Sequence, residues 1–334
     1  MSDNELLLEV EDLHVEFRTS DGVANVLNGV GYSVHAGETL AVLGESGSGK
    51  SVTAQTVMGI LDTPPGVITG GAVRWRGEDL LTASEDRRRE VRGSEIAMIF
   101  QDALSALNPV FTVGFQIEEQ LRVRLGMSRK DARKRAIELL DIVRIPAADR
   151  RLKDYPHQFS GGMRQRAMIA MSLALDPDLL IADEPTTALD VTVQAQIMDL
   201  LGEIQAERKM GLVLITHDLG VVAEVADRIA VMYAGRIVEQ ADVVELFRAP
   251  AHPYTAALMD SLPRLDLKGQ TLETIKGLPP SLLDVPPGCP FHPRCKRAED
   301  RCSSEVPAPR GIGLGRTSAC HFAEDVVVNS RGSV

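Results

Sequence analysis

Short apolar runs alternate along most of this chain with longer segments whose apolar residues recur every three or four positions. The apolar runs have the length of buried parallel strands, and they lie at 39–43, 95–100, 179–182 and 212–215. The helical spacing is found at 51–61, 113–143, 164–175 and 191–209. Strands that alternate with helices predict an α/β fold, in which ligands bind at the carboxyl ends of the strands.

Other segments have patterns that differ from this alternation. Partly alternating runs at 6–10 and 13–17 predict one broken strand, 30–34 and 72–75 predict two more, and 229–238 predicts a hairpin. Eleven of the 18 prolines lie from Pro250 onward, where one helix at 253–262 is expected and the rest is irregular. The change in composition predicts two regions, 1–248 and 249–334.

Composition narrows the function classes. Hydrophobic residues make up 44% of the 334 residues and charged residues 25%, as in an ordinary globular chain. The formal net charge of −11 argues against nucleic acid as the partner, because phosphate backbones are bound by basic surfaces. No apolar run has the length of a membrane span, and the acidic first residues lack the basic region of a signal peptide. These features predict a cytoplasmic location.

The most informative stretch follows the apolar run at 39–43. It fits the phosphate-loop pattern G-x-x-x-x-G-K-[ST] with Gly44, Glu45, Ser46, Gly47, Ser48, Gly49, Lys50 and Ser51. Its glycines allow backbone N–H groups to point inward as an anion nest, at the start of a helix whose dipole favours negative charge. Lys50 is expected to reach the β- and γ-phosphates, and Ser51 to bind Mg²⁺. The stretch predicts a nucleotide-binding protein.

Further polar residues stand where strands end or helices begin. Gln101, the pair Asp183-Glu184, and His217 each follow an apolar run, as the phosphate loop does. Ser160, Gly161 and Gly162 immediately precede the helical segment at 164–175, which makes a second anion-binding position by the same physics.

These motifs, together with Ala188-Leu189-Asp190, occur in the order and spacing of an ATP-binding-cassette (ABC) ATPase. The resemblance covers about residues 6–247. It implies an α/β nucleotide-binding domain with a P-loop RecA-like core, an antiparallel β subdomain and a helical subdomain at about 102–175, followed by a small irregular extension rich in cysteine and proline.

Within that family the chain resembles the ATPase subunits of dipeptide and oligopeptide importers, a group that includes nickel and glutathione systems. The resemblance rests on Pro250 and on the segments 252–255, 261–263 and 287–295. The segment 159–166, with Met163 where the second kind of subunit usually has glutamine, resembles the first of two paired ATPase subunits.

The resemblance implies a role for each motif residue. Ser51, Gln101 and Asp183 would hold Mg²⁺, Glu184 would act as general base, and His217 would contact the γ-phosphate. Phe17 is a candidate to stack on adenine, with ordinary core packing as the equal alternative. The residues that would close on ATP held by a second ATPase subunit are Ser160, Gly161, Gly162 and Asp190.

All four cysteines lie in the extension, at Cys289, Cys295, Cys302 and Cys320. A reducing compartment favours metal ligation over disulfides, but the spacing lacks the paired C-x₂-C of common zinc sites. An iron–sulfur cluster, a zinc ion and unliganded thiols all remain open from the residues alone. The resemblance favours a 4Fe-4S cluster. A structural role is expected rather than electron transfer, because the sequence shows no redox-partner motif.

The predicted function is therefore ATP hydrolysis that energises peptide import at the cytoplasmic face of the inner membrane. The implied partners are a second ATPase subunit, two transmembrane permease subunits and, indirectly, an extracytoplasmic binding protein, with no nucleic acid. Nickel, glutathione or another small solute is an alternative cargo. A soluble non-transport ABC ATPase is more distant, because the chain has one phosphate loop and a negative charge. Glu184 and His217 together argue against a regulator that only binds nucleotide.

Overall fold

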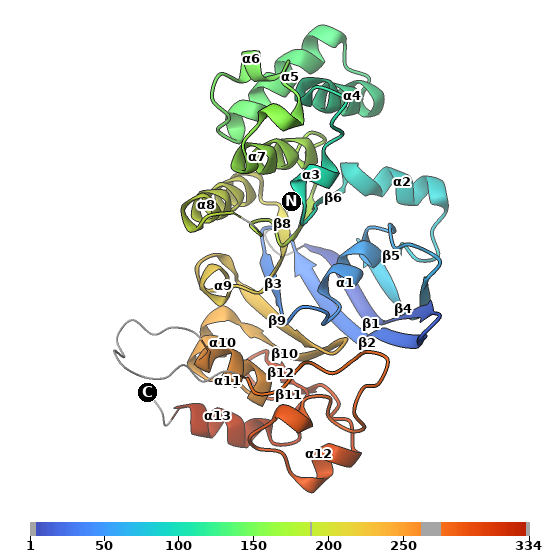
Figure 1. The fold of residues 1–334 in the computed structure, drawn as a ribbon, viewed down its shortest axis with the longest axis vertical. Helices are drawn as coiled ribbons and strands as arrows, with labels where there is room; N and C mark the ends of the chain where they lie inside the picture. The colour runs from blue at the N-terminus through green and yellow to red at the C-terminus, as the bar shows by residue number, and fades with distance from the viewer. Residues whose placement is uncertain (1–4, 188, 262–274, 332–334) are drawn as a thin grey trace. The chain divides into compact units, whose positions relative to one another are not determined.

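The computed structural model describes residues 5–187, 189–261 and 275–331 (Figure 1). Ala188, Leu262 and Pro263, which contributed to the family resemblance, lie outside the described residues. The chain divides into two compact units. The first comprises Met1–Leu7, Val34–Glu38 and Thr82–Ile215, and the second comprises Leu8–Ser33, Thr39–Leu81 and Thr216–Val334.

The first unit contains a parallel ladder of three buried strands. These are β6 (Ile96–Ile99), β7 (Leu179–Asp183) and β8 (Gly211–Thr216), with β7 between the other two. Every residue of the three strands is buried, which explains why they appear in the sequence as unbroken apolar runs. The strands end at the polar residues that the sequence analysis singled out.

Helices make up most of the rest of the first unit (Figure 1). They are α2 (Glu85–Ser94), α3 (Ala103–Ala106), α4 (Val113–Leu125), α5 (Arg129–Ile142), α6 (Ala148–Arg151), the 3₁₀ helix η1 (Pro156–Gln158), α7 (Gly161–Ser172) and α8 (Val191–Arg208). The helical pattern at 113–143 is two helices, because Gly126 ends α4 in the left-handed conformation with φ 63°.

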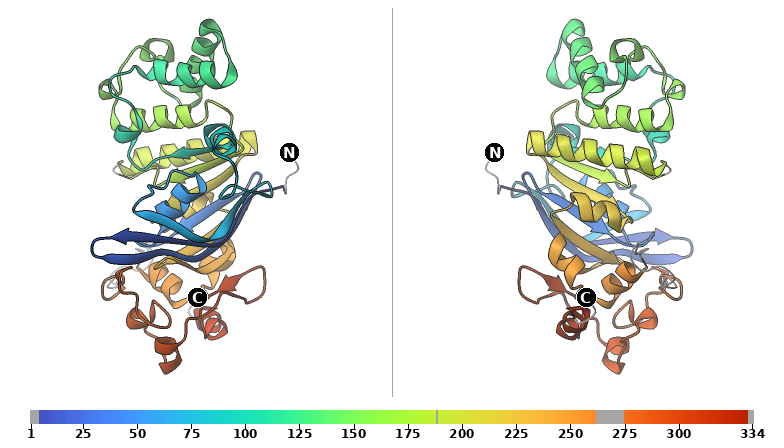
Figure 2. Two further views of the ribbon diagram at one scale, coloured as in Figure 1. Left: turned by 90° about the vertical axis from the view of Figure 1, so that its right-hand side faces the viewer. Right: turned by 90° about the vertical axis from the view of Figure 1, so that its left-hand side faces the viewer.

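The second unit contains an antiparallel sheet in the order β2-β1-β4-β5. Its strands are β1 (Leu6–Thr19), β2 (Gly22–His35), β4 (Gly66–Trp75) and β5 (Glu78–Asp79). Figure 2 shows the long strands β1 and β2 side by side. The expected broken strand is one strand, β1, whose register with β4 shifts between Glu11 and Val15. An antiparallel β region was expected, but β2 and β4 begin earlier than the sequence indicated.

The same unit carries the phosphate-loop strand. Here β3 (Thr39–Leu43) pairs in parallel with β9 (Arg228–Tyr233), which forms a hairpin with β10 (Arg236–Asp242). The helices around them are α1 (Lys50–Val57), α9 (Leu219–Val225), α10 (Val243–Arg248) and α11 (Pro253–Asp260). Both the hairpin and the helix at the start of the extension were predicted, although α1 and α11 end earlier than expected.

The extension has more regular structure than its composition predicts. It contains η2 (His292–Arg294), α12 (Asp300–Ser304), β11 (Arg310–Gly311), β12 (Thr317–Ser318) and α13 (Ala323–Arg331). β12 pairs with β10, so the extension continues the sheet of the hairpin. Beside this pairing Arg316 contacts the fully buried carboxylate of Glu239 at 3.3 Å, and Glu239 also accepts the backbone N–H groups of Ala251 and His252. Burial raises the pKa of Glu239, and these contacts oppose the rise.

Among the described residues, no helix combines the length and the apolar character that crossing a membrane requires.

Candidate nucleotide-binding and hydrolysis site

The phosphate loop joins a fully buried strand to a helix that no side chain caps. β3 is buried along its whole length, and α1 begins at Lys50 after Gly49, whose φ of 105° lies in the left-handed region. A side chain at Gly44 would place its Cβ 2.3 Å from the carbonyl oxygen of Met232. The strand and the helix therefore fix both ends of the loop, and glycine is required at positions where the chain turns or packs tightly.

Polar groups within the loop are arranged around its backbone. The Lys50 ammonium donates to the carbonyl oxygens of Gly44 at 2.8 Å and Glu45 at 3.1 Å, and the Lys50 residue is 5% exposed. The Ser48 hydroxyl is buried and has no hydrogen-bond partner among the residues that the structure describes. Burying a hydroxyl group without a hydrogen-bond partner costs free energy, and an anion bound in the loop would supply that partner. The loop thus has the chemistry of a phosphate site.

In the first unit, two predicted residues from distant parts of the sequence meet at the end of β7. Asp183 is the last residue of this strand and is buried. The Glu184 carboxylate accepts a hydrogen bond from the Gln101 side-chain amide at 3.0 Å, across 83 residues of sequence. It also accepts the Thr187 hydroxyl at 2.9 Å, and the Glu184 N–H donates to the Ile215 carbonyl at 2.9 Å. These hydrogen bonds hold Glu184 beside Asp183 and fix the orientation of its carboxylate.

The other predicted motif of this unit forms two neighbouring helix N-termini. Ser160 caps α7, with its hydroxyl accepting the Met163 N–H at 3.3 Å, and Asp190 caps α8, accepting the Val193 N–H at 2.9 Å. A Cβ at Gly162 would lie 2.8 Å from a methyl group of Val193. Gly162 is required because the two helix starts approach closely. The structure places Ser160, Gly161 and Gly162 near α8, so that this helix N-terminus forms a compact surface compatible with an anion.

Two further predicted residues belong to the second unit. His217 is exposed between β8 and α9, next to Asp218, which caps α9. Phe17 is half-buried on β1, opposite Gly66 of β4. This burial fits either a partly packed core residue or a surface on which a base could stack, so the choice for Phe17 stays a prediction. The phosphate loop and His217 thus lie in one unit, and Gln101, Asp183, Glu184, Ser160 and Asp190 in the other.

The four cysteines of the extension line one cavity. Cys289, Cys295, Cys302 and Cys320 surround it together with Phe291, His252 and other residues of the extension. All four are free thiols, and the Sγ atoms of Cys295 and Cys320 accept backbone N–H groups at 3.4 Å. Within the described ranges, however, no three His, Cys, Asp or Glu side chains are grouped so that they could hold a metal ion.

Burial governs the ionisation of these thiols. It raises the pKa of Cys289 and of Cys320 to about 11, and it raises the pKa of Cys295 as well. The three thiols are therefore neutral near pH 7 unless a metal displaces their protons. The rings of His292 and His321 contact main-chain carbonyl oxygens of Cys289 and Glu305. Those contacts suit two ordinary polar residues of the extension.

Comparison with known proteins identifies the family. A family profile described as ABC transporter matches residues 27–187, and one described as oligopeptide/dipeptide transporter, C-terminal region, matches residues 238–302. The dipeptide transport ATP-binding protein DppD of Bacillus subtilis is 51% identical over 303 residues, covering 91% of this chain and 90% of that protein. The chain belongs to the ABC transporter ATPase family. A putative peptide import ATP-binding protein of Brucella abortus is 52% identical over 314 residues, which are 94% of each chain.

Solved structures support the same ABC cassette fold. The dimeric structure of MJ0796, a bacterial ABC transporter cassette, covers 71% of this chain at 29% identity with a TM-score of 0.63. CbiO1 from Clostridium perfringens, part of an ABC transporter complex, covers 73% at 31% identity with a TM-score of 0.62. The predicted family, fold class and ATPase activity of this chain are confirmed, with the oligopeptide/dipeptide type of C-terminal region.

Sequence reasoning missed two sets of contacts at this ABC site. Thr187 lies three residues after Glu184, so the turn that follows β7 could have pointed to it. Arg294 and Tyr254 contact Glu45 from more than 200 positions away, and no local pattern signals them.

Replacing Gly49 with alanine is expected to damage the phosphate loop. The new Cβ would lie 2.8 Å from side-chain atoms of Leu27 and Met232 and 2.9 Å from the Val26 carbonyl oxygen, at a strained φ. Calorimetric titration is expected to show ATP affinity falling by about tenfold or more, the scale of about 1–3 kcal/mol of strain. Gly77→Ala is the control, because Gly77 also has a positive φ but open space around it. Equal ATP affinity in both variants would contradict this reading of the loop.

Proposed function

We propose that the chain is the ATP-hydrolysing subunit of an importer for dipeptides or oligopeptides. The observation that carries the proposal is the combination, in one chain, of the ABC region at 27–187 and the oligopeptide/dipeptide transporter C-terminal region at 238–302. Relatives that are about half identical over nine-tenths of the chain carry names of dipeptide transport and peptide import proteins. We further propose that the cassette occupies residues 1–248 and the extension residues 249–334.

We assign binding of the nucleotide phosphates to the loop from Gly44 to Ser51. The backbone nest and the Lys50 ammonium supply positive potential, and the unpartnered Ser48 hydroxyl supplies a further polar group. Mg²⁺, with Ser51, Asp183 and Gln101 as its proposed ligands, would neutralise charge on the phosphates. Phe17 is the proposed adenine contact and His217 the proposed γ-phosphate contact.

Glu184 is the proposed general base for the attacking water. Hydrogen bonds from Gln101 and Thr187 fix the orientation of its carboxylate. A lone pair of the carboxylate could therefore face the attacking water without a rearrangement of the side chain during the reaction. Gln101, on the segment that leads into the helical part of the first unit, is the proposed sensor of water and metal. Ser160, Gly161, Gly162 and Asp190 are proposed to close on ATP bound by a second subunit.

The proposed assembly pairs this chain with a homologous ATPase subunit and with two transmembrane permease subunits, at the cytoplasmic face of the membrane. An extracytoplasmic binding protein would deliver the solute. The pairing draws support from the cassette MJ0796, whose solved structure is a dimer. Nucleic acid is not proposed as a partner, in keeping with the formal net charge of −11.

For the extension we propose a 4Fe-4S cluster held by Cys289, Cys295, Cys302 and Cys320. Four thiols around one cavity supply the donor set that such a cluster requires, and backbone N–H groups already point at two of the sulfurs. A zinc ion bound by the same four thiols is the alternative, because four thiolates can also hold one zinc. The cluster's proposed role is structural, because it would join segments that lie up to 31 positions apart.

Glu184→Gln is expected to keep ATP binding but to lower the hydrolysis rate by about 10²-fold or more, because a positioned base is lost. Lys50→Ala is expected to weaken ATP binding itself, since the phosphates lose a counter-charge. Steady-state ATPase assays and equilibrium binding on the same preparations separate the two effects. Near-normal turnover of the Glu184 variant would remove it from the mechanism, and unchanged affinity of the Lys50 variant would contradict the phosphate-loop assignment.

Anaerobically purified protein is expected to contain about four irons per chain, with matching sulfide. Cys295→Ser is expected to lose iron, while His292→Ala and His321→Ala serve as controls that keep it. Metal analysis of the four preparations checks this. Zinc in place of iron would show that the four cysteines form a zinc site. Metal-free protein whose extension still resists protease would contradict both the cluster and the zinc site.

The choice of solute can be tested in proteoliposomes that contain the complete transporter. Peptide-loaded binding protein is expected to stimulate ATP hydrolysis, whereas binding protein loaded with nickel or glutathione is not. Stimulation by nickel or glutathione alone would replace the peptide assignment while leaving the ATPase assignment intact.

A further inference from the structure

Glu45, the second residue of the phosphate loop, forms an ion pair with a side chain from the C-terminal extension. The Arg294 guanidinium donates to one Glu45 carboxylate oxygen at 2.7 Å and to the other at 3.0 Å, across 249 residues of sequence. The Arg294 side chain is 6% exposed and that of Glu45 is 24% exposed. A two-point contact between a guanidinium and a carboxylate is directional as well as electrostatic, so it fixes the orientation of Glu45.

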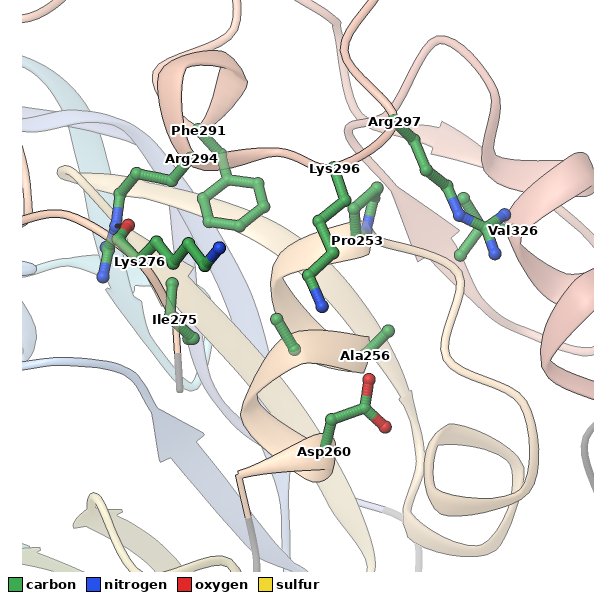
Figure 3. Close-up of a pocket in the computed structure, with 11 residues that line it drawn as sticks. Pro253, Ala256, Asp260, Ile275, Lys276, Phe291, Arg294, Lys296, Arg297 and Val326 are labelled. Atoms are coloured by element: carbon green, nitrogen blue, oxygen red, sulfur yellow. Dashed lines mark hydrogen bonds between the residues drawn. The ribbon is translucent and has the colours of Figure 1, made fainter. Parts of the chain in front are cut away.

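Neighbouring groups fix Arg294 in turn. Its Nη1 also donates to the Tyr233 hydroxyl at 3.2 Å, and its Nε donates to the Lys276 carbonyl at 3.2 Å. Figure 3 shows Arg294 leaving the same turn of chain as Phe291, with Lys276 beside it. The Phe291 ring packs 5.3 Å from the rings of both Tyr233 and Tyr254, which holds the turn against the sheet. The hydrogen bonds to Glu45 are the main cause that raises the pKa of Arg294 above its usual value, so the guanidinium stays charged.

A second residue of the extension binds the same loop residue. The Glu45 N–H donates to the Tyr254 hydroxyl oxygen at 3.0 Å, and Tyr254 is fully buried. The Glu45 carbonyl oxygen accepts the Lys50 ammonium at 3.1 Å. The three polar groups of Glu45 are thus all engaged: the side chain and the N–H by the extension, and the carbonyl by the lysine proposed to bind phosphate.

We propose that Arg294 is a positioning residue for nucleotide binding, and that through it the extension sets the shape and charge of the phosphate loop. This inference rests on the proposed binding of phosphates by the loop. It assigns the extension a task besides holding the proposed cluster, at Arg294, which directly precedes Cys295.

Two physical effects follow from the contact. Arg294 cancels the charge of a carboxylate that would otherwise repel the phosphates arriving in the same loop. It also holds the Glu45 backbone where its carbonyl steadies Lys50, so the loop is ordered before nucleotide binds. Loss of Arg294 leaves Glu45 partly buried and unpaired, which costs more than the pair itself contributes.

Calorimetric titration of the full-length chain with Mg·ATP tests the proposal. Arg294→Gln is expected to weaken ATP binding by about tenfold, which lies within the usual range of coupling between two sites. Arg294→Lys, which keeps the charge but not the two-point contact, is expected to lose less. Arg301→Gln is the matched control, because Arg301 forms an exposed ion pair with Glu305 in the same extension, at some distance along the chain from Arg294. Its ATP affinity is expected to equal that of the wild type.

The double variant Glu45→Gln/Arg294→Gln separates positioning from mere structural support. Removing the unpaired carboxylate is expected to restore much of the ATP affinity that Arg294→Gln loses. A loss that is equally large in the double variant, or no loss in Arg294→Gln, would overturn the proposal. If Arg294→Gln does not fold, Arg294→Lys with and without Glu45→Gln decides the same question.

Two further measurements complete the test. Lys50→Ala in the same titration separates failure of the proposed function from failure of this inference. If Lys50→Ala does not change ATP affinity, the assignment of the phosphate loop is wrong. If Lys50→Ala weakens ATP binding but Arg294→Gln does not, only the inference about Arg294 is wrong. If nucleotide and Arg294 are coupled, saturating ATP is also expected to slow hydrogen exchange at the backbone amides of residues 292, 294 and 295 in the wild type but not in Arg294→Gln. Equal exchange with and without ATP in the wild type would contradict the coupling.

Discussion

A loop of backbone N–H groups binds phosphate well only if its shape is held before the phosphate arrives, and several elements of the second unit contribute to that constraint. β3 is buried along its length and fixes the start of the loop, while α1 fixes its end. Gly44 and Gly49 let the chain pass next to β9 and β2, where any side chain would collide with Met232 or Val26. Lys50 folds back onto the loop's own carbonyls.

The extension takes part in the same constraint. Its sheet pairing with β10 and the buried contact of Arg316 with Glu239 attach it to the hairpin that flanks β3. From that attachment Tyr254 and Arg294 reach Glu45, and Phe291 packs between the aromatic residues and the cavity of the four cysteines. These contacts to the cassette therefore help to order the extension.

In the first unit the corresponding constraint is the orientation of a carboxylate. Glu184 has a positive φ of 46°, an unusual conformation for a residue with a side chain, and its N–H is tied to β8. Hydrogen bonds from Gln101 and Thr187 then determine where its oxygens lie. A carboxylate held in one orientation at the end of a buried strand suits the general-base role proposed for Glu184.

The sequence by itself determined the alternation of buried strands and helices, the phosphate loop and the order of the motifs. Each of these is a local pattern, since apolar runs, glycine spacing and helix starts are written in neighbouring residues. It also determined the family, because the motifs occur together at family spacing. Only the tertiary structure showed that the helical pattern at 113–143 is two helices, and that β12 joins the hairpin sheet. Likewise only the fold brings Gln101 to Glu184 and Arg294 to Glu45, since contacts across 83 and 249 residues depend on how strands pair and leave no periodic trace in the sequence.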